Sequence, residues 1–128
     1  MGFFSNLFAK KTPAPIYEEV EIKVAGVTFK NGRKHRQTIL RKIKFRDDEF
    51  ANNCQVSIEQ YDFEGEVALG VYVNGQQIGN IPRDKKEWLI ENGDRIVGGF
   101  NLKVYGGDNG KSFGAIIKLK LKQNQETT

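Results

Sequence analysis

The sequence of 128 residues contains few of the side chains that build metal sites, disulfides and nucleophilic active sites. Its one cysteine is Cys54 and its one histidine is His35. A single cysteine excludes an internal disulfide, and one cysteine with one histidine cannot supply four zinc ligands. No P-loop, no Ser-His-Asp signature and no paired carboxylates on one predicted face are found. We therefore expect no metal, no cofactor and no enzymatic activity, and we interpret Cys54 as a small buried apolar residue.

Long hydrophobic runs are also missing. No apolar stretch approaches the roughly 20 residues that a membrane-spanning helix needs, and no secretory signal precedes the first polar segment. The sequence therefore predicts a cytoplasmic protein with no membrane span. Residues 1–18 combine apolar side chains at helical spacing with a proline-containing linker. This segment is either an anchor or partner-binding helix, or a terminus that folds back on the domain.

Aromatic residues, by contrast, are plentiful, with nine Phe, four Tyr and one Trp. Such a composition favours a packed globule over disorder, and the length supports a single modest core. We expect one domain over residues 19–122 and a polar tail over residues 123–128. The formal net charge of +4 makes the chain moderately basic.

The clearest local signal is a β-hairpin. Val67–Val73 is rich in β-branched and aromatic residues, which suit a pleated, half-buried surface. Asn74 and Gly75 follow at once, and this dipeptide favours the positive φ angles of a type I′ turn. Residues 76–81 then predict the return strand, which Pro82 ends because proline has no N–H for the ladder.

The remaining elements follow from periodicity. Alternating polar and apolar residues predict further strands at 19–24, 54–60, 94–105 and 111–122. Gly98 and Gly99 interrupt the third of these, where we expect a bulge or a barrel corner. Helical spacing predicts short helices at 34–43 and 84–92, the second with Asp84 as its N-cap. The fold class is therefore mainly β, with about six strands and two short α-helices. Bends at glycines favour a small closed or partly open barrel.

The order of these motifs resembles the HIRAN domain family. The resemblance rests on the Tyr-Asp pair at residues 61–62, on Ala68 and Val71, and on the Asn-Gly-x-x-Ile-Gly-x-Ile-Pro segment at 74–82. It implies an OB-like β-barrel and a nucleic-acid-binding module that captures the 3′ end of single-stranded DNA during DNA repair or processing.

The resemblance also implies a pocket. Its residues would be Phe29, Tyr61, Asp62, Asn80 and Arg83. The Tyr61 ring would stack on a base, and the Asp62 carboxylate would accept a hydrogen bond from a terminal sugar hydroxyl. Residues 63–67 separate the Tyr-Asp pair from Ala68 and bring Glu64 and Glu66 near this pocket. In the alternative interpretation, Tyr61 and Asp62 only fix the start of the hairpin.

Positive charge is concentrated between residues 30 and 46, which include eight Lys and Arg and no acidic residue. Within this run Arg33, Lys34 and Arg36 are candidates for contacts with a phosphate backbone. The run can equally be the solvated face of a helix. The alternative function is a protein-interaction domain that uses the barrel groove or the apolar amino-terminal segment.

Overall fold

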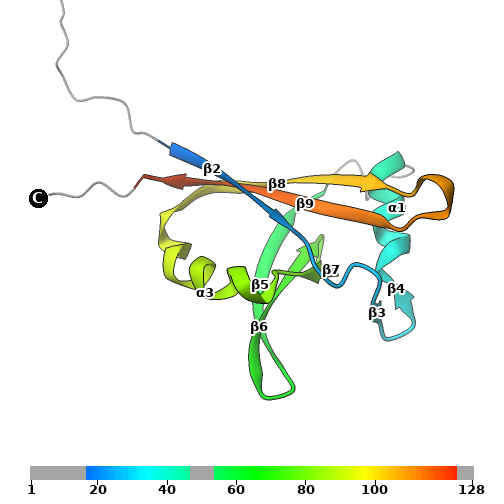
Figure 1. The fold of residues 1–128 in the computed structure, drawn as a ribbon, viewed down its shortest axis with the longest axis horizontal. Helices are drawn as coiled ribbons and strands as arrows, with labels where there is room; N and C mark the ends of the chain where they lie inside the picture. The colour runs from blue at the N-terminus through cyan, green and yellow to red at the C-terminus, as the bar shows by residue number, and fades with distance from the viewer. Residues whose placement is uncertain (1–16, 47–53, 124–128) are drawn as a thin grey trace, which may run out of the picture.

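The computed structural model describes residues 17–46 and 54–123, so the apolar segment at 1–16 and the tail beyond 123 lie outside the described residues. Within the described ranges the chain forms eight strands and two α-helices (Figure 1). The strands are β2 (Tyr17–Lys23), β3 (Lys30–Asn31), β4 (Lys34–His35), β5 (Val56–Phe63), β6 (Glu66–Val73), β7 (Gln76–Asn80), β8 (Ile96–Gly106) and β9 (Phe113–Lys122). The helices are α1 (Arg36–Phe45) and α3 (Arg83–Asn92), with 3₁₀ turns η1 (Gly93–Arg95) and η2 (Asp108–Gly110).

These strands form three antiparallel sheets. Two have three strands, in the orders β2-β9-β8 and β5-β6-β7, and one is the short pair β3-β4. The prediction of a mainly β protein with two short helices is confirmed. Among the described residues the sheets do not close into a barrel, so the OB-like barrel is not confirmed.

The sheet β2-β9-β8, called the long sheet below, supplies much of the core. Ile117, Leu119 and Leu121 alternate along β9 and are fully or almost fully buried, while the lysines between them occupy the outer face. β9 is the middle strand, paired with β2 on one side and β8 on the other. The pairing with β2 reaches Tyr17, opposite Lys122. The pairing therefore includes two residues before the start of the strand predicted at 19–24.

The predicted bulge in the third long strand is present. The register between β8 and β9 shifts between Val97 and Asn101, the interval that contains both glycines. Gly98 has a φ of 72°, a left-handed conformation that side chains other than glycine rarely adopt.

The predicted hairpin is present as β6 and β7. Asn74 and Gly75 have φ angles of 51° and 82°, as a type I′ turn requires. A second turn was not predicted. Glu64 and Gly65 adopt φ angles of 52° and 85° and join β5 to β6. Strand β5 therefore continues to Phe63 instead of ending at residue 60, and the sheet is a three-stranded meander.

The helix predicted over residues 34–43 begins two residues later than expected. Lys34 and His35 are extended because they pair with Asn31 and Lys30 across the tight turn at Gly32. Helix α1 then starts at Arg36. Its second residue, Gln37, binds the carbonyls of Val27 and Phe113 and the N–H of Phe113, at 2.8–2.9 Å. These bonds hold α1 against the start of β9.

The second helix ends as predicted near Gly93, but its predicted N-cap is wrong. Helix α3 begins at Arg83 with Pro82 in the N-cap position, and no side chain caps its first turn. Asp84 lies inside that turn, where its charge is still favourable for the helix dipole. Proline is preset for a helix start, which explains the shift.

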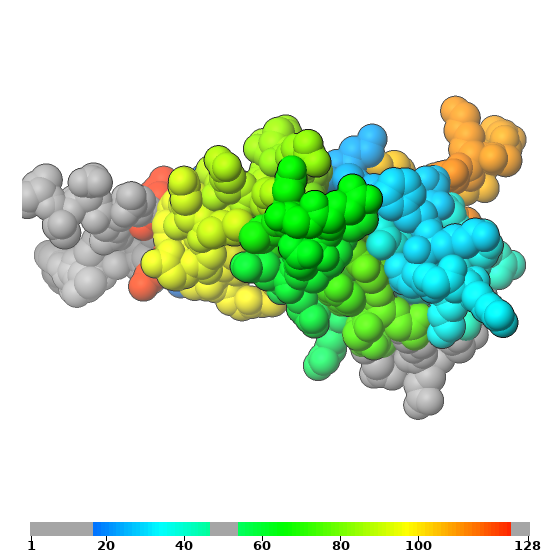
Figure 2. Space-filling model, turned by 90° about the horizontal axis from the view of Figure 1, so that it is seen from below, coloured from blue at the N-terminus to red at the C-terminus, as the bar shows by residue number. Residues whose placement is uncertain are grey.

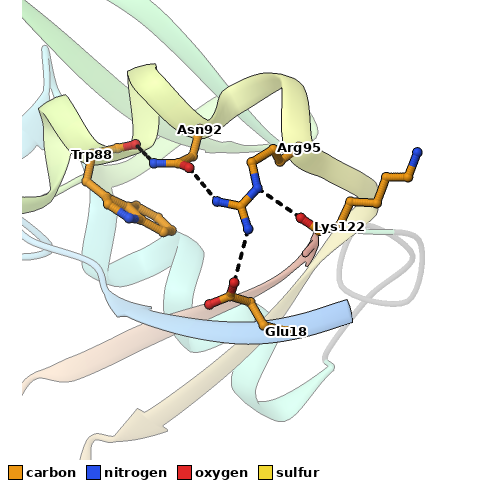
Figure 3. Close-up of polar contacts among 5 residues, drawn as sticks. All are labelled: Glu18, Trp88, Asn92, Arg95 and Lys122. Atoms are coloured by element: carbon orange, nitrogen blue, oxygen red, sulfur yellow. Dashed lines mark hydrogen bonds and ion pairs between the residues drawn. The ribbon is translucent and has the colours of Figure 1, made fainter. Parts of the chain in front are cut away.

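One arginine fastens the end of α3 to the long sheet (Figure 3). Arg95 donates to the Lys122 carbonyl at 2.9 Å, to Asn92 at 2.6 Å and to the Glu18 carboxylate at 3.1 Å. Asn92 in turn donates to the Trp88 carbonyl at 2.8 Å. Trp88 is partly buried and packs against the core.

The two larger sheets are joined where β2 passes β7. Ala25 and Asn80 exchange both backbone N–H···O bonds at 2.8 Å. Gly79 permits this approach, because a Cβ there would lie 2.5 Å from the Ala25 carbonyl oxygen and would also collide with Val24. The bridge places Asn80 against the segment that leads to β3 and α1.

Candidate functional site

A hollow lies where the meander meets the segment between β2 and α1. Its lining comes from β5, β6 and β7 and from the segment between β2 and α1. In Figure 2 this segment (cyan) lies beside the β5–β6 hairpin (green). The lining residues central to its chemistry are Phe29, Arg36, Tyr61, Phe63, Asn80 and Arg83. Its volume is about 290 Å³. Ligand pockets usually hold about 300–1,000 Å³, so this hollow suits one small group.

The structure brings together four of the five residues that the resemblance assigned to the pocket. Phe29, Tyr61, Asn80 and Arg83 all line the hollow. Asp62 does not line it and is exposed. Neighbouring residues on a strand point to opposite faces, so Asp62 faces away from Tyr61 on β5. The expected contact between Asp62 and a terminal sugar hydroxyl is therefore not supported.

Of the three basic candidates, Arg36 lines this hollow, and Arg33 and Lys34 lie in hollows that adjoin it. A second hollow shares Arg36, Tyr61 and Phe63 with the first and continues over Lys30 and Lys34. A third shares Lys34 with the second and includes Arg33. Arg33 and Lys34 are exposed. The three hollows therefore adjoin one another from Arg83 to Arg33.

Arg36 is the buried charge of this site. It is 6% exposed, and no other charged side chain is buried among residues 17–46 and 54–123. Its Nε donates to Asn31 Oδ1 at 2.8 Å, and its Nη1 donates to the Gly26 carbonyl at 2.9 Å and to Asn80 Oδ1 at 3.3 Å. All three acceptors are neutral. Within the described ranges Nη2 has no acceptor, and no carboxylate pairs with the guanidinium.

This environment acts on the ionisation of Arg36. Burial lowers the pKa of the guanidinium from its ordinary value, while Tyr61 and Tyr72 act in the opposite direction. Arginine nevertheless keeps its charge in proteins. The Phe29 ring lies 5.7 Å from the guanidinium carbon, within the range of a cation–π contact. The site is thus a buried cation beside aromatic rings.

The Arg36 guanidinium also sets the direction of the next hydrogen bonds. Because a guanidinium can only donate, the oxygen of the Asn80 amide must face it. The nitrogen of that amide then donates to the Tyr61 oxygen at 2.5 Å. Gln77 donates to the same oxygen at 3.3 Å. The Tyr61 hydroxyl hydrogen has no acceptor within the described chain.

The rim of the first hollow carries opposite charges. Arg83 lies 3.6 Å from the Glu66 carboxylate, and both side chains are largely exposed. Lys86 donates to the Val67 carbonyl at 2.6 Å. The expected proximity of Glu66 to the pocket is therefore found, whereas Glu64 lies in the turn and is not part of the lining. Exposed ion pairs of this kind contribute little stability.

The sequence analysis did not predict two residues that line the first hollow, Phe63 and Lys86. Phe63 was overlooked, although it lies two residues from Tyr61 and alternation predicts that the two share a face. Lys86 was also overlooked, although it lies three residues after Arg83 in helix α3 and therefore on the same face. The burial of Arg36 had no sequence signal, because a basic run looks the same whether one member is buried or none is.

Among residues 17–46 and 54–123, no group of three His, Cys, Asp or Glu side chains is placed to hold a metal ion. The helices in this part of the chain are too short or too polar to cross a bilayer. Comparison with known proteins gave no match to a family model, to a curated protein or to a solved structure.

Proposed function

We propose that the protein is a HIRAN-like module that binds single-stranded nucleic acid, with one end of a DNA strand in the hollow between Phe29 and Tyr61. The observation that carries this proposal is the buried Arg36 guanidinium at that hollow. Its acceptors are neutral and its Nη2 is unpaired within the described chain. Taking a charge out of water without an opposite charge is costly, and an anionic ligand would offset that cost.

Aromatic side chains around this cation favour an unpaired base as the neighbour of the anion. Phe29 and Phe63 are 61% and 53% exposed, unusually high for phenylalanine, and Tyr61 lines the same hollow. Stacking of a base on an aromatic ring contributes about 1–3 kcal/mol and requires a base that is not paired in a duplex. Single strands therefore fit better than double strands.

The charge along the adjoining hollows supports the same ligand. The first two are lined by Lys30, Lys34, Arg36, Arg83 and Lys86, against the single carboxylate of Glu66. The third adds Arg33. A row of cations leading away from an aromatic pocket suits the phosphate backbone of a strand whose end occupies that pocket.

Binding of fluorescently labelled oligonucleotides tests the proposal. Single-stranded, duplex and tailed DNA of one sequence would be compared at two salt concentrations. We expect the single strand and the tailed duplex to bind more tightly than the blunt duplex. Tyr61→Ala should weaken binding by about 1–3 kcal/mol, as the loss of a stacking ring generally does.

The salt dependence tests the basic row separately. Each phosphate contact adds about 0.7 to the slope of log affinity against log salt for single strands. Replacing Arg33 and Lys34 by Ala should therefore reduce the slope by about 1.4. The matched control replaces Lys118 and Lys120, which lie on the outer face of β9. Equal slopes in wild type and the Arg33/Lys34 variant would mean that these two residues contact no phosphate and that the basic run is only a solvated surface.

A protein ligand is the second candidate, and one observation favours it. Val67 is 42% exposed and lies with the exposed Phe29 and Phe63 in the lining of the first hollow. Exposed apolar residues that cluster in this way are typical of peptide-binding grooves. Tight binding of peptides, with no affinity for any oligonucleotide, would decide for this alternative.

A further inference from the structure

We infer that the pocket prefers a strand end that carries a phosphate over one that ends in a free hydroxyl. This inference rests on the proposed function and specifies its ligand. It follows from the direction of the hydrogen bonds around Arg36, Asn80 and Tyr61. The groups that these residues leave unsatisfied are donors.

The first unsatisfied donor is the guanidinium of Arg36. Its Nε and Nη1 have protein acceptors at 2.8–3.3 Å, while Nη2 has none within the described ranges. The side chain lines both the first and the second hollow, so a ligand in either can reach it. A cation that is 94% removed from solvent and lacks a carboxylate attracts an anion more strongly than a neutral hydroxyl.

The second unsatisfied donor is the Tyr61 hydroxyl. Arg36 fixes the orientation of the Asn80 amide, and that amide in turn makes the Tyr61 oxygen an acceptor at 2.5 Å. Gln77 reinforces this arrangement from the other side, at 3.3 Å. The hydroxyl hydrogen is therefore left to donate to whatever occupies the pocket. The chain from Arg36 through Asn80 to Tyr61 thus presets a second donor for the same ligand.

The side-chain acceptors that a sugar hydroxyl would need are either outside the lining or already paired with protein groups. Asp62 is exposed and outside the lining. Asn80 Oδ1 already accepts from Arg36 and from Gln77. The Glu66 carboxylate is at the rim, 3.6 Å from Arg83. A hydroxyl oxygen can accept from Arg36 but has no negative charge to pair with the guanidinium, whereas a terminal phosphate offers three acceptor oxygens and nearly two negative charges.

Terminal and internal phosphates also differ in their negative charge. A phosphodiester within a strand carries one negative charge, while a terminal phosphate near neutral pH carries between 1.5 and 2, by the usual second pKa of about 6. Arg36 and Tyr61 together match the more highly charged group. The preference should consequently weaken when the terminal phosphate gains a proton below about pH 6.

The experiment compares one short single strand in four forms. These carry a phosphate at the 3′ end, a phosphate at the 5′ end, phosphates at both ends, or hydroxyls at both ends. We expect at least one singly phosphorylated form to bind about tenfold more tightly than the form with two hydroxyl ends, the usual effect of a charge-assisted hydrogen bond. Inorganic phosphate and a mononucleotide serve as competitors, and we expect neither alone to match the phosphorylated strand.

Two variants make the comparison specific. Tyr61→Phe removes the hydroxyl donor and keeps the ring. The ratio of the affinity for the tighter-binding phosphorylated strand to the affinity for the strand with two hydroxyl ends should therefore fall. Tyr105→Phe makes the same change on β8, away from the three hollows, and should leave the ratio unchanged. Thermal unfolding of both variants checks that each is folded.

The outcomes separate the inference from the function on which it rests. Equal affinities for phosphate and hydroxyl ends, or tighter binding of the hydroxyl form, would overturn the inference and leave strand binding intact. A preference that survives Tyr61→Phe at full size would overturn the assigned role of Tyr61. No binding of any oligonucleotide would overturn the proposed function, and the inference with it.

Discussion

Asn80 donates a side-chain N–H to the Tyr61 oxygen at 2.5 Å, across the meander from β7 to β5. The opposite end of the same amide accepts from Arg36 at 3.3 Å. One side chain therefore links the buried cation to the aromatic ring beside it. The backbone of Asn80 is held at the same time, since it bridges to Ala25. The position of this residue thus depends on the junction between the two larger sheets.

Asn80→Asp tests the unpaired charge. A carboxylate there would neutralise Arg36, so we expect the free energy of unfolding to rise by about 1 kcal/mol at neutral pH, as charge-assisted bonds exceed neutral ones. Anion binding should fall at least about tenfold, because the cation is already paired. Chemical denaturation and oligonucleotide titration measure the two effects.

The added stability should depend on pH in a defined direction. Arg36 would hold the pKa of the new carboxyl below the ordinary aspartate value of about 3.9. A depressed folded-state pKa contributes stability above the unfolded pKa and loses it as the pH falls through the folded one. Asn101→Asp, on β8 away from the site, is the matched charge control. A variant destabilised at neutral pH with undiminished binding would contradict the account.

Glu66→Gln should strengthen anion binding. The carboxylate lines the hollow and pairs with Arg83 at 3.6 Å, so it competes with a ligand for that cation. Exposed pairs contribute about 0.2–1 kcal/mol, which corresponds to a gain in affinity of roughly 1.4-fold to fivefold. Glu64→Gln, in the turn beside it, is the control that should change little. Weaker binding by the Glu66 variant would mean that this carboxylate contacts the ligand.

Gly79→Ala should destabilise the protein through the sheet junction. Its Cβ would lie 2.5 Å from the Ala25 carbonyl oxygen, where backbone must move. Overpacking of this kind costs about 1–3 kcal/mol. Gly99→Ala is the control, because a Cβ there meets nothing within 4 Å. Equal unfolding free energies for the two variants would show that the junction accommodates the added methyl group at little cost in stability.

Arg95→Ala should loosen α3 from the long sheet. The guanidinium makes hydrogen bonds to Lys122, Asn92 and Glu18, and it is partly shielded from solvent. Their loss should lower the free energy of unfolding by about 1–3 kcal/mol. Amide hydrogen exchange should accelerate first in residues 83–95. Uniform acceleration throughout the domain would instead indicate global unfolding alone.

The parts of the fold that sequence predicts well are those with local causes. The turn at Asn74 and Gly75 needs two positive φ angles, and the sequence supplies the two residue types that accept them. The bulge at Gly98 also has a local cause, because glycine accepts the φ of 72° found there. The turn at Glu64 was missed because its first residue is glutamate, which is not among the residue types typical of a type I′ turn. Sheet pairing, and whether the sheets of residues 17–46 and 54–123 close into a barrel, depend on contacts between distant segments, which periodicity does not encode.

In the candidate site, too, some features were predicted from the sequence and others depend on the three-dimensional arrangement. Resemblance to a family pattern named Phe29, Tyr61, Asn80 and Arg83, which the fold brings to one hollow. It also named Asp62, whose side chain points elsewhere because Tyr61 and Asp62 are consecutive residues of one strand. Burial of Arg36 arises from its place at the start of α1, behind the β3–β4 turn. Only the three-dimensional arrangement distinguishes it from the exposed cations in the same run.

The most direct measurement follows the Arg36 and Tyr61 side chains by NMR while a short single-stranded oligonucleotide is added. The account predicts that the Arg36 guanidinium N–H resonances and the Tyr61 and Phe29 ring signals shift together and saturate with the binding curve. Those of Arg95, on the far side of α3, should stay in place. Saturable binding that leaves Arg36 and Tyr61 unshifted, with the changes confined to the outer face of the β2-β9-β8 sheet, would contradict it.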